Sequence, residues 1–161
     1  GEDARCDVGT MAHIVDCQDF GEGRYLLECE MRERFRVTSW LEDDPYPRAE
    51  VQPWPDEAGP VVTGGDIEVV EDRLMEMFER IASARNTTLP PRQELIGEPE
   101  PGDDAGKRLY ALSSRVPMGQ ADRYSVLEAP SAAARLDALR DAVETVAAMI
   151  EFQLADDDPA G

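Results

Sequence analysis

The sequence predicts an α+β protein in which a β segment is followed by a helical bundle. Up to about residue 60, short runs alternate apolar and polar residues, and turn-forming residues separate the runs. After Gly64-Gly65 the hydrophobic period changes from 2 to 3.6. The 161 residues are enough for one domain or two small ones with a buried core.

Four short strands are expected in the β segment, because each run is rich in β-branched or aromatic residues. Residues 19–23 contain two glycines, and residues 43–47 contain two prolines that remove two backbone donors, so both stretches predict turns. The expected strands are Val8–Val15, Arg24–Met31, Arg34–Trp40 and Arg48–Trp54.

The second and third expected strands fit a hairpin whose loop is residues 31–33. In this register Glu30 faces Arg34 on one side, and Cys29 faces Phe35 on the other. Each such pair contributes about 0.2–1 kcal/mol, and a slip of one residue would spoil both faces. The loop contains no glycine, although loops of this length usually need a residue with positive φ.

Arginines 32, 34 and 36 look like a basic stripe in this segment. In the expected hairpin the last two face carboxylates, which predicts a solvated, ion-paired surface. An anion-binding site is the alternative interpretation.

The second half of the chain predicts helices. Asp66 is the expected N-cap of a helix that ends near Arg85, and Ser131 is the expected N-cap of the last helix. Between them we expect one short turn at 93–96 and helices over 107–115 and 120–127. The apolar stripe of the first helix consists of Val70, Leu74, Met77, Phe78 and Ile81.

The last helix carries apolar residues at alternating spacings of three and four. This spacing is typical of a bundle seam or a short coiled coil, and about three heptads do not decide between them. The residues are Leu136, Leu139, Val143, Val146, Ile150 and Leu154.

These elements suggest two domains: a β subdomain over 1–62 and a helical subdomain over 63–158. The acidic, glycine-containing stretch 97–106 is expected to be a flexible connector within the helical subdomain. The tail 155–161 is expected to be disordered.

The charge of the chain limits its partners. Sixteen Lys and Arg oppose 35 Asp and Glu, which gives a formal net charge of −19. Such a chain repels nucleic acid and anionic membranes. There is no apolar run of about 18 residues and no signal peptide at the start. Three cysteines without a CxxC pair suit reduced thiols, so we expect a cytoplasmic protein.

Residues 102–108, GDDAGKR, resemble a phosphate-binding loop only superficially. Three residues separate the glycines where the motif needs four, and Arg108 stands where the motif needs Ser or Thr. We therefore interpret this stretch as a linker, and no cofactor is expected.

Other catalytic or metal sites have little support. His13 with Cys6, Cys17 and Cys29 matches no zinc-finger spacing. A Ser–Lys dyad could form only if Ser113 or Ser114 approached Lys107, on a segment without visible oxyanion donors. The sequence therefore predicts no catalytic residue, no metal site and no enzyme activity.

The order of the segments resembles the N-terminal domain of Lon proteases. The resemblance rests on GTMAHIVDC, on GEGRYLLECEMRERFRVTSWLEDDPYPRAEV and on VPMGQADRYSVLEAPSAAARLDAL, and it covers residues 8 to about 154. It implies a PUA-like β pseudo-barrel followed by a helical bundle. In the full proteases this region resembles a module that engages substrates and supports the hexamer.

The chain departs from the family in three ways. The family's opening strands are missing, so the barrel is expected to be incomplete at the N-terminus. The expected hairpin tip carries Met31-Arg32, where relatives often have glycine, and the connector 97–106 looks expanded. Nothing matches the ATPase or the Ser–Lys peptidase of the full proteases, so neither activity is implied.

These observations favour a non-catalytic module that binds unfolded or flexible polypeptide. An unpaired strand edge could accept an extended peptide, and exposed aromatic side chains could anchor apolar ones. Trp40, Tyr46 and Trp54 flank the proline turn and are the candidate peptide-binding residues. The two tryptophans could instead close the junction between sheet and helices.

The alternative function is that of a structural or oligomerisation adaptor. In that case the last helix would provide a seam for a partner or for self-association. The candidate interface residues are Leu139, Val143, Val146 and Ile150.

Overall fold

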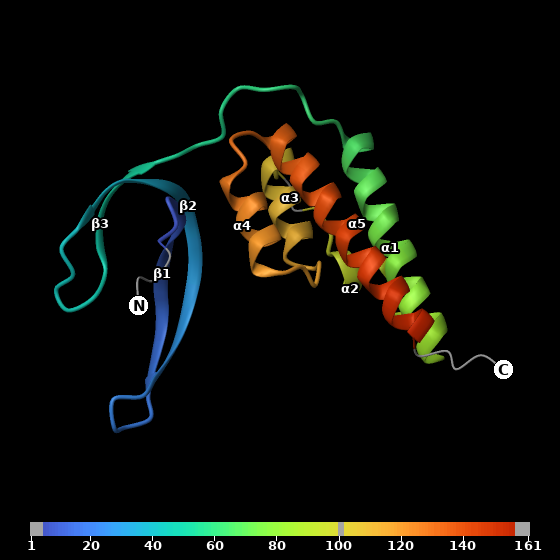
Figure 1. The fold of residues 1–161 in the computed structure, drawn as a ribbon, viewed down its shortest axis with the longest axis horizontal. Coiled ribbons are helices and arrows are strands. Elements are labelled where there is room, and N and C mark those ends of the chain that lie inside the picture. The colour runs from blue at the N-terminus through green and yellow to red at the C-terminus, as the bar shows by residue number, and fades with distance from the viewer. Residues whose placement is uncertain (1–4, 100–101, 157–161) are drawn as a thin grey trace. The chain divides into compact units, whose positions relative to one another are not determined.

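The computed structural model describes residues 5–99 and 102–156, and the chain divides into two compact units (Figure 1). The sheet unit, Gly1–Pro55, contains the strands, and the helical unit, Asp56–Gly161, contains the helices. The predicted division at residue 62 stays a prediction. Of the tail predicted to be disordered over 155–161, residues 155 and 156 instead end the last helix, and 157–161 lie outside the described residues. The elements are β1 (Val8–Asp19), β2 (Tyr25–Leu41), β3 (Arg48–Pro53), α1 (Gly64–Arg85), α2 (Arg92–Ile96), α3 (Ala105–Ser113), α4 (Gln120–Glu128) and α5 (Ala132–Asp156).

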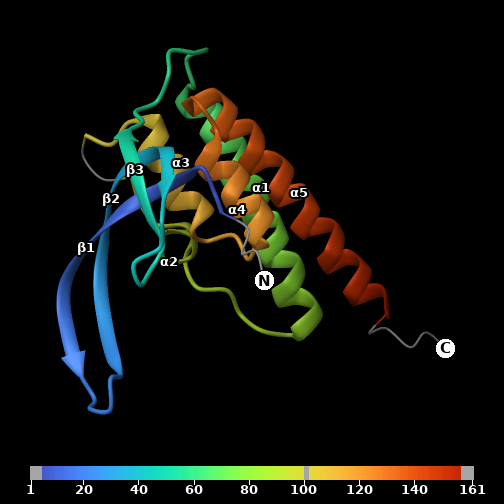
Figure 2. The same cartoon turned by 60° about the vertical axis from the view of Figure 1, so that its left-hand side comes forward.

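The strands form an antiparallel sheet in the order β1-β2-β3. β1 pairs with β2 from Tyr25 to Arg36. β3 pairs only with Phe35–Leu41. The outer part of the β1–β2 hairpin is therefore two-stranded, and its long, curved course is visible in Figures 1 and 2.

The predicted hairpin with its loop at residues 31–33 is wrong, because β2 runs without a turn from Tyr25 to Leu41. Arg34 lies opposite Thr10 rather than Glu30, and Arg36 lies opposite Val8. Residues alternate on either side of residues 31–33 in one continuous strand as they do in the hairpin, so the pattern alone could not separate the two. A register shift on β2 between Met31 and Arg34 takes the place of the expected loop.

The tip between β1 and β2 is formed by residues 20–24, as the glycines predicted. Gly21, Glu22 and Gly23 all have positive φ, which glycine adopts without steric cost. The backbone N–H of Phe20 donates to the carbonyl of Arg24 and closes the tip. The proline turn separates β2 from β3, also as predicted.

Helix α1 begins at Gly64, and its N-cap is Thr63 rather than the predicted Asp66. The two residues form a capping box. The Asp66 backbone N–H donates to the Thr63 hydroxyl, and the Thr63 backbone N–H donates to the Asp66 carboxylate at 2.9 Å. The Thr63 hydroxyl also lies 2.6 Å from the Asp66 carboxylate, and its hydrogen bond, together with that of the backbone N–H, lowers the pKa of Asp66. A carboxylate in the first turn also suits the helix dipole.

The remaining helices lie close to their predicted positions. Asp104 caps α3, which therefore begins at Ala105, two residues before its expected start and inside the predicted flexible connector. The backbone N–H of Ala134 donates to the Ser131 hydroxyl at 3.2 Å, in the capping position predicted for the last helix. Figures 1 and 2 both show α1 and α5 side by side.

The hydrophobic core described here lies in the helical unit. Apolar side chains from all five helices or their flanking turns meet in it, and Leu74, Leu109, Leu112 and Leu139 are fully buried. A packed core of this kind supplies most of the stability of a small helical bundle.

Two arginines are also buried in the helical unit, and the sequence did not indicate either. Arg108 donates from Nε to Glu71 at 2.9 Å and from Nη2 to the carbonyl of Gly97 at 3.1 Å. Arg135 makes a two-pronged pair with Asp56. The first pair joins α3 to α1 and to the end of α2, and the second joins α5 to the start of the unit.

Candidate functional site

The outer part of the β1–β2 hairpin exposes apolar side chains on one face. Leu27 and Met31 alternate with acidic residues along β2, and Cys29 lies opposite Ile14 of β1. Leu27, Met31 and Ile14 expose 48%, 65% and 52% of their surface. Such a contiguous apolar face on a sheet normally packs against another part of the protein or against a binding partner. We call the surface formed by Ile14, Leu27, Cys29 and Met31 the apolar face.

The opposite face of the same strands is acidic. Glu28 and Glu30 project there, and the register places Asp16 opposite Glu28 and His13 opposite Glu30. Arg32 forms an ion pair with Glu30 at 2.6 Å. Among the described residues, no basic side chain forms an ion pair with Glu28. We call the surface formed by Asp16, Glu28 and Glu30 the acidic face.

The outer part of β2 has a free backbone edge. Because β3 stops at a position opposite Phe35, residues 25–33 of β2 pair on one side only, with β1. Within the part of the chain that the structure describes, no strand occupies the other side. Unpaired N–H and C=O groups along such an edge can accept an added strand.

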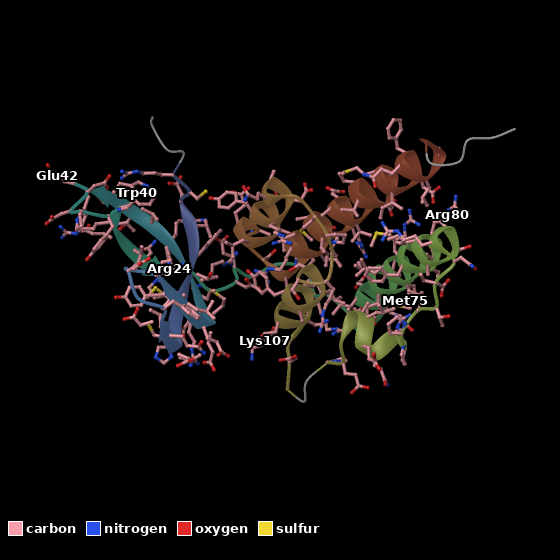
Figure 3. The ribbon with its side chains drawn as sticks, turned by 90° about the horizontal axis from the view of Figure 1, so that it is seen from below. Arg24, Trp40, Glu42, Met75, Arg80 and Lys107 are labelled. Atoms are coloured by element: carbon pink, nitrogen blue, oxygen red, sulfur yellow. The ribbon has the colours of Figure 1, made fainter. Side chains whose placement is uncertain are left out.

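The proline turn carries two of the predicted peptide-binding residues at the surface. Trp40 is 37% exposed and Tyr46 is 65% exposed. The guanidinium of Arg5 lies over the Trp40 ring, 4.8 Å from its centroid, and forms an ion pair with Asp43 at 3.0 Å. Figure 3 shows Trp40 and Glu42 close together at the end of β2. Both aromatic side chains remain candidates for contact with a polypeptide.

Trp54, the third candidate, is buried rather than displayed. Its ring lies between two guanidinium groups, with Arg34 at 4.0 Å and Arg36 at 3.7 Å from the centroid. Arg34 also donates from Nε to the Trp54 carbonyl at 3.2 Å. The two arginines were predicted to face the carboxylates of a neighbouring strand. They instead make cation–π contacts with the Trp54 ring. An indole held in this way braces the end of the sheet and has little area left for a ligand.

The predicted helix-interface residues lie mainly in the core of this chain. Leu139, Val143 and Val146 are buried, with exposures of 0, 1 and 5%, and Ile150 packs partly buried against them. The other helices of the unit cover these side chains. A partner could reach the first three only if the bundle opened.

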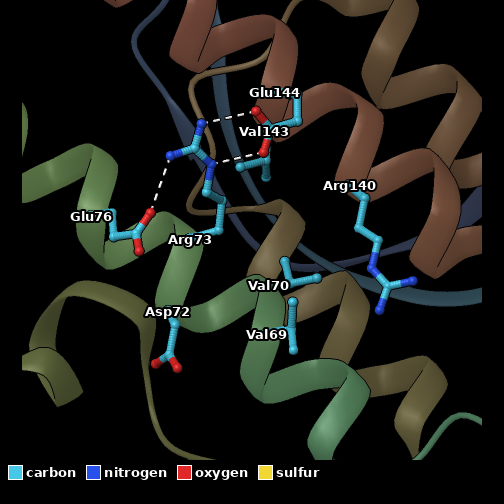
Figure 4. A pocket seen from close by; sticks show the side chains of 8 residues that line it. All are labelled: Val69, Val70, Asp72, Arg73, Glu76, Arg140, Val143 and Glu144. Atoms are coloured by element: carbon cyan, nitrogen blue, oxygen red, sulfur yellow. Dashed lines mark hydrogen bonds and ion pairs between the residues drawn. The ribbon is translucent and has the colours of Figure 1, made fainter.

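An open groove of about 490 Å³ lies between α1 and α5, and Figure 4 shows the side chains that line it. Val70 and Val143 are among its apolar residues, and Arg73, which also lines it, forms hydrogen bonds with two carboxylates. Arg73 donates from Nε to Glu144 at 2.7 Å and from Nη1 to Glu76 at 3.1 Å. The hydrogen bond from Arg73 lowers the pKa of Glu144 below its ordinary value. This groove has ion pairs on its wall and no arrangement of nucleophile and base.

The serines considered as nucleophiles are engaged with their own helix. Ser113 Oγ donates to the carbonyl of Tyr110, and Ser114 Oγ donates to the carbonyl of Ala111, both at 2.7 Å. In the stretch 102–108, the carboxylate of Asp104 accepts the backbone N–H of Lys107 at 2.8 Å. An anion bound at this helix start would have to displace that carboxylate.

A metal ion has no evident site in residues 5–99 and 102–156, where no three His, Cys, Asp or Glu side chains come together to hold one. The three cysteines are free and exposed. Over the same residues, no helix is both long and apolar enough to cross a bilayer.

The free edge of β2 was not singled out from the sequence. Its signal is the alternation in Leu27-Glu28-Cys29-Glu30-Met31, which gives one apolar and one acidic face. The mistaken loop at residues 31–33 hid it, because it paired this stretch with residues 34–37 and left no free edge there.

Comparison with known proteins gives one family and one fold. The family model described as the ATP-dependent protease La (LON) substrate-binding domain matches residues 1–145. The chain is similar to the crystal structure of a Lon N-terminal domain protein from Xanthomonas campestris. The TM-score is 0.53 at 19% identity, and the match covers 87% of this chain and 70% of that one. No curated protein matches the chain significantly.

Proposed function

The chain belongs to the ATP-dependent protease La (LON) substrate-binding domain family, and we propose that it is a non-catalytic module that holds unfolded or flexible polypeptide. The resemblance noted from the sequence is confirmed at the level of the family, and the α+β fold agrees with the similar structure. The proposal concerns what this particular chain binds and where.

The observation that carries the proposal is the contrast between the two units. The helical unit encloses its large apolar side chains in a core, whereas the sheet unit exposes most of its own. The exposed set in the sheet unit is Met11, Ile14, Val15, Phe20, Tyr25, Leu26, Leu27, Met31, Trp40, Leu41, Tyr46 and Val51. Surfaces of this kind mark sites of interaction with other proteins.

The exposed side chains suit a ligand that is unfolded. An unfolded chain offers apolar side chains and unpaired backbone groups together. The sheet unit has an exposed apolar surface for the first and an unpaired strand edge for the second. The apolar face can contact the side chains, and the edge of β2 at residues 25–33 can pair with the backbone. A folded protein has already paired or buried most of these groups.

The other expectations for the chain remain part of the proposal. We place it in the cytoplasm, with polypeptide rather than nucleic acid as its partner, in keeping with the net charge of −19. We also propose that the three strands form part of a PUA-like β pseudo-barrel. An adaptor that uses Leu139 and Val143 as a seam has no support in their burial.

Binding of a permanently unfolded protein tests the proposal. Fluorescence anisotropy would measure the affinity of the chain for a labelled, reduced and alkylated client, with the native form of the same client as a control. We expect binding of the unfolded form alone, and a loss of about tenfold or more for Leu27→Ser with Met31→Ser, because two apolar contacts are removed.

The matched control is Phe152→Ser on α5, because Phe152 is exposed by 69%, about as much as Met31. This variant should bind like the parent chain. Equal loss in both variants, or no binding of the unfolded client by the parent chain, would contradict the proposal.

A further inference from the structure

We propose that the free edge of β2 selects extended segments in which apolar and basic residues alternate. This inference rests on the proposed function and specifies the class of polypeptide that the site takes. The segment would pair with Tyr25–Met31 and continue the line of β3 along the sheet.

The backbone of the hairpin offers a prepared place for this strand. β2 itself is regular over Tyr25–Met31, because the register shift on β2 lies between Met31 and Arg34 and the other shift, between Ile14 and Asp16, places its extra residue on β1. A two-stranded ribbon is marginally stable in water, and a third strand adds hydrogen bonds and side-chain contacts. Strand addition therefore stabilises the hairpin while it binds the segment.

The side chains of β2 determine the preferred pattern. Neighbouring residues of a strand point to opposite faces, so an added strand meets Leu27, Cys29 and Met31 on one face. On the other face it meets Glu28 and Glu30. Directly opposite side chains contribute to pairing when both are apolar or when their charges are opposite. The complement of this strand is therefore apolar on one face and cationic on the other.

The like charges on the acidic face favour a cation there. Glu28 lies directly opposite Asp16, and like charges in that position destabilise a strand pair. Glu30 already has Arg32 as a partner at 2.6 Å, whereas Glu28 has no cation among the residues described. A Lys or Arg next to Glu28 in an added strand would offset this repulsion.

A second copy of the chain is a poor occupant of the same edge. If the β2 edges of two copies paired with their apolar faces on one side, Glu28 and Glu30 of one copy would meet the same residues of the other. The net charge of −19 on each chain adds repulsion at a distance. The charge pattern thus points to a basic segment from another protein.

Four blocked, labelled nine-residue peptides test the proposal by anisotropy with the full chain. The first alternates valine and lysine, the second alternates valine and glutamate, and the third contains the residues of the first in two blocks. The fourth is the first with N-methyl groups on every residue, which remove the backbone donors along both edges of the peptide. We expect the first to bind at least tenfold more tightly than each of the others, and less tightly as salt is added.

A protein variant tests the acidic face separately. The double change Glu28→Gln with Glu30→Gln should reduce the affinity for the valine–lysine peptide about tenfold. The remaining affinity should depend less on salt concentration than that of the parent chain. Glu42→Gln is the matched control, because Glu42 is exposed just beyond β2 and away from the edge. Circular dichroism of all variants would verify that the fold is retained.

Two results would overturn the inference while the proposed function stands. In the first, the chain binds the unfolded client but has equal affinity for the valine–lysine and valine–glutamate peptides. The other is a stable dimer of the chain in sedimentation that the valine–lysine peptide fails to dissociate. Absence of binding to the unfolded client would instead contradict the proposed function itself.

Discussion

Arg135 is the largest fully buried side chain in the described residues, and its charge is held by two contacts. Its Nη1 and Nη2 donate to the Asp56 carboxylate at 2.8 and 2.6 Å, and its guanidinium lies 3.9 Å from the centroid of the Tyr110 ring. Burial lowers the pKa of Arg135, but the interactions with Asp56 and Tyr110 together outweigh this, and the pKa is raised overall. Asp56 thus keeps a buried cation paired.

The change Asp56→Asn should destabilise the helical unit by about 2–4 kcal/mol, because it leaves Arg135 buried without its counter-charge. Urea unfolding followed by far-ultraviolet circular dichroism would measure the loss. Glu79→Gln on α1 is the control, because Glu79 is exposed and has no ion-pair partner within the described part of the chain. Equal stabilities of the two variants would show that the Arg135 pair contributes little.

In the sheet unit, the ring of Phe35 lies against Gly9. A Cβ at position 9 would come within 2.6 Å of Phe35 Cζ, and the two residues are directly opposite in β1 and β2. The close approach of ring and backbone requires glycine at this position.

The change Gly9→Ala should therefore destabilise the sheet unit by about 1–3 kcal/mol, because the ring must move from its place. Hydrogen exchange of the β1 and β2 amides would report this as faster exchange. Gly64→Ala is the control, since its added Cβ would meet nothing within 4 Å. Unchanged exchange in Gly9→Ala would mean that Phe35 moves without cost.

At the scale of elements, α1 and α5 run parallel and are joined by a ladder of ion pairs. Arg73 pairs with Glu144 at 2.7 Å and Arg80 pairs with Glu151 at 2.8 Å, one heptad further along both helices. The spacing of seven on both helices is that of a parallel coiled coil, which was one of the two predicted interpretations of the last helix. The seam joins α5 to α1 of the same chain.

The ladder predicts how the stability of the helical unit depends on pH. Hydrogen bonds from Arg73 and Arg80 lower the pKa values of Glu144 and Glu151 below the ordinary value of 4.5. The unfolded chain then binds more protons near pH 4, so this stability is fully present above about pH 4.5 and is lost as pH falls through the folded values.

Replacing both carboxylates, by Glu144→Gln with Glu151→Gln, should make the fall in stability below pH 4.5 shallower than in the parent chain. Thermal melts between pH 3 and 7 in low salt would measure it. A curve parallel to that of the parent chain would mean that the two pairs do not contribute.

Most helices could be predicted from the sequence because their signals are local. Ser131 capped the last helix as expected, and the period of 3.6 located the stripe of α1. The buried arginines could not be predicted, since Arg108 and Arg135 have partners 37 and 79 residues away along the chain. Long separations of this kind leave no pattern in a local window.

The strands show the same limit in another form. Alternation predicted which residues share a face within each half of β2, but it could not separate one long strand from a hairpin, and it could not show that the register shift between Met31 and Arg34 reverses the two faces. Of the three candidate peptide-binding residues, Trp40 and Tyr46 are exposed and their role stays a prediction, whereas Trp54 is buried between Arg34 and Arg36.

At the scale of the whole molecule, apolar surface is divided unequally between the two units. The helical unit buries enough of it to form a core, and the sheet unit leaves it available. This division suits a module in which the helices supply stability and the sheet supplies binding surface. Unpaired edges and exposed apolar faces cost stability and favour association, which is a reason to expect them at a binding site.

The most direct test of this account is hydrogen exchange of the chain with and without an unfolded client, resolved by mass spectrometry. We predict slower exchange in β1 and in residues 25–33 of β2 when the client is bound, because an added strand protects the amides of the free edge. The helical unit should exchange at the same rates in both samples. Protection confined to the helical unit, with the β1–β2 hairpin unchanged, would contradict the account.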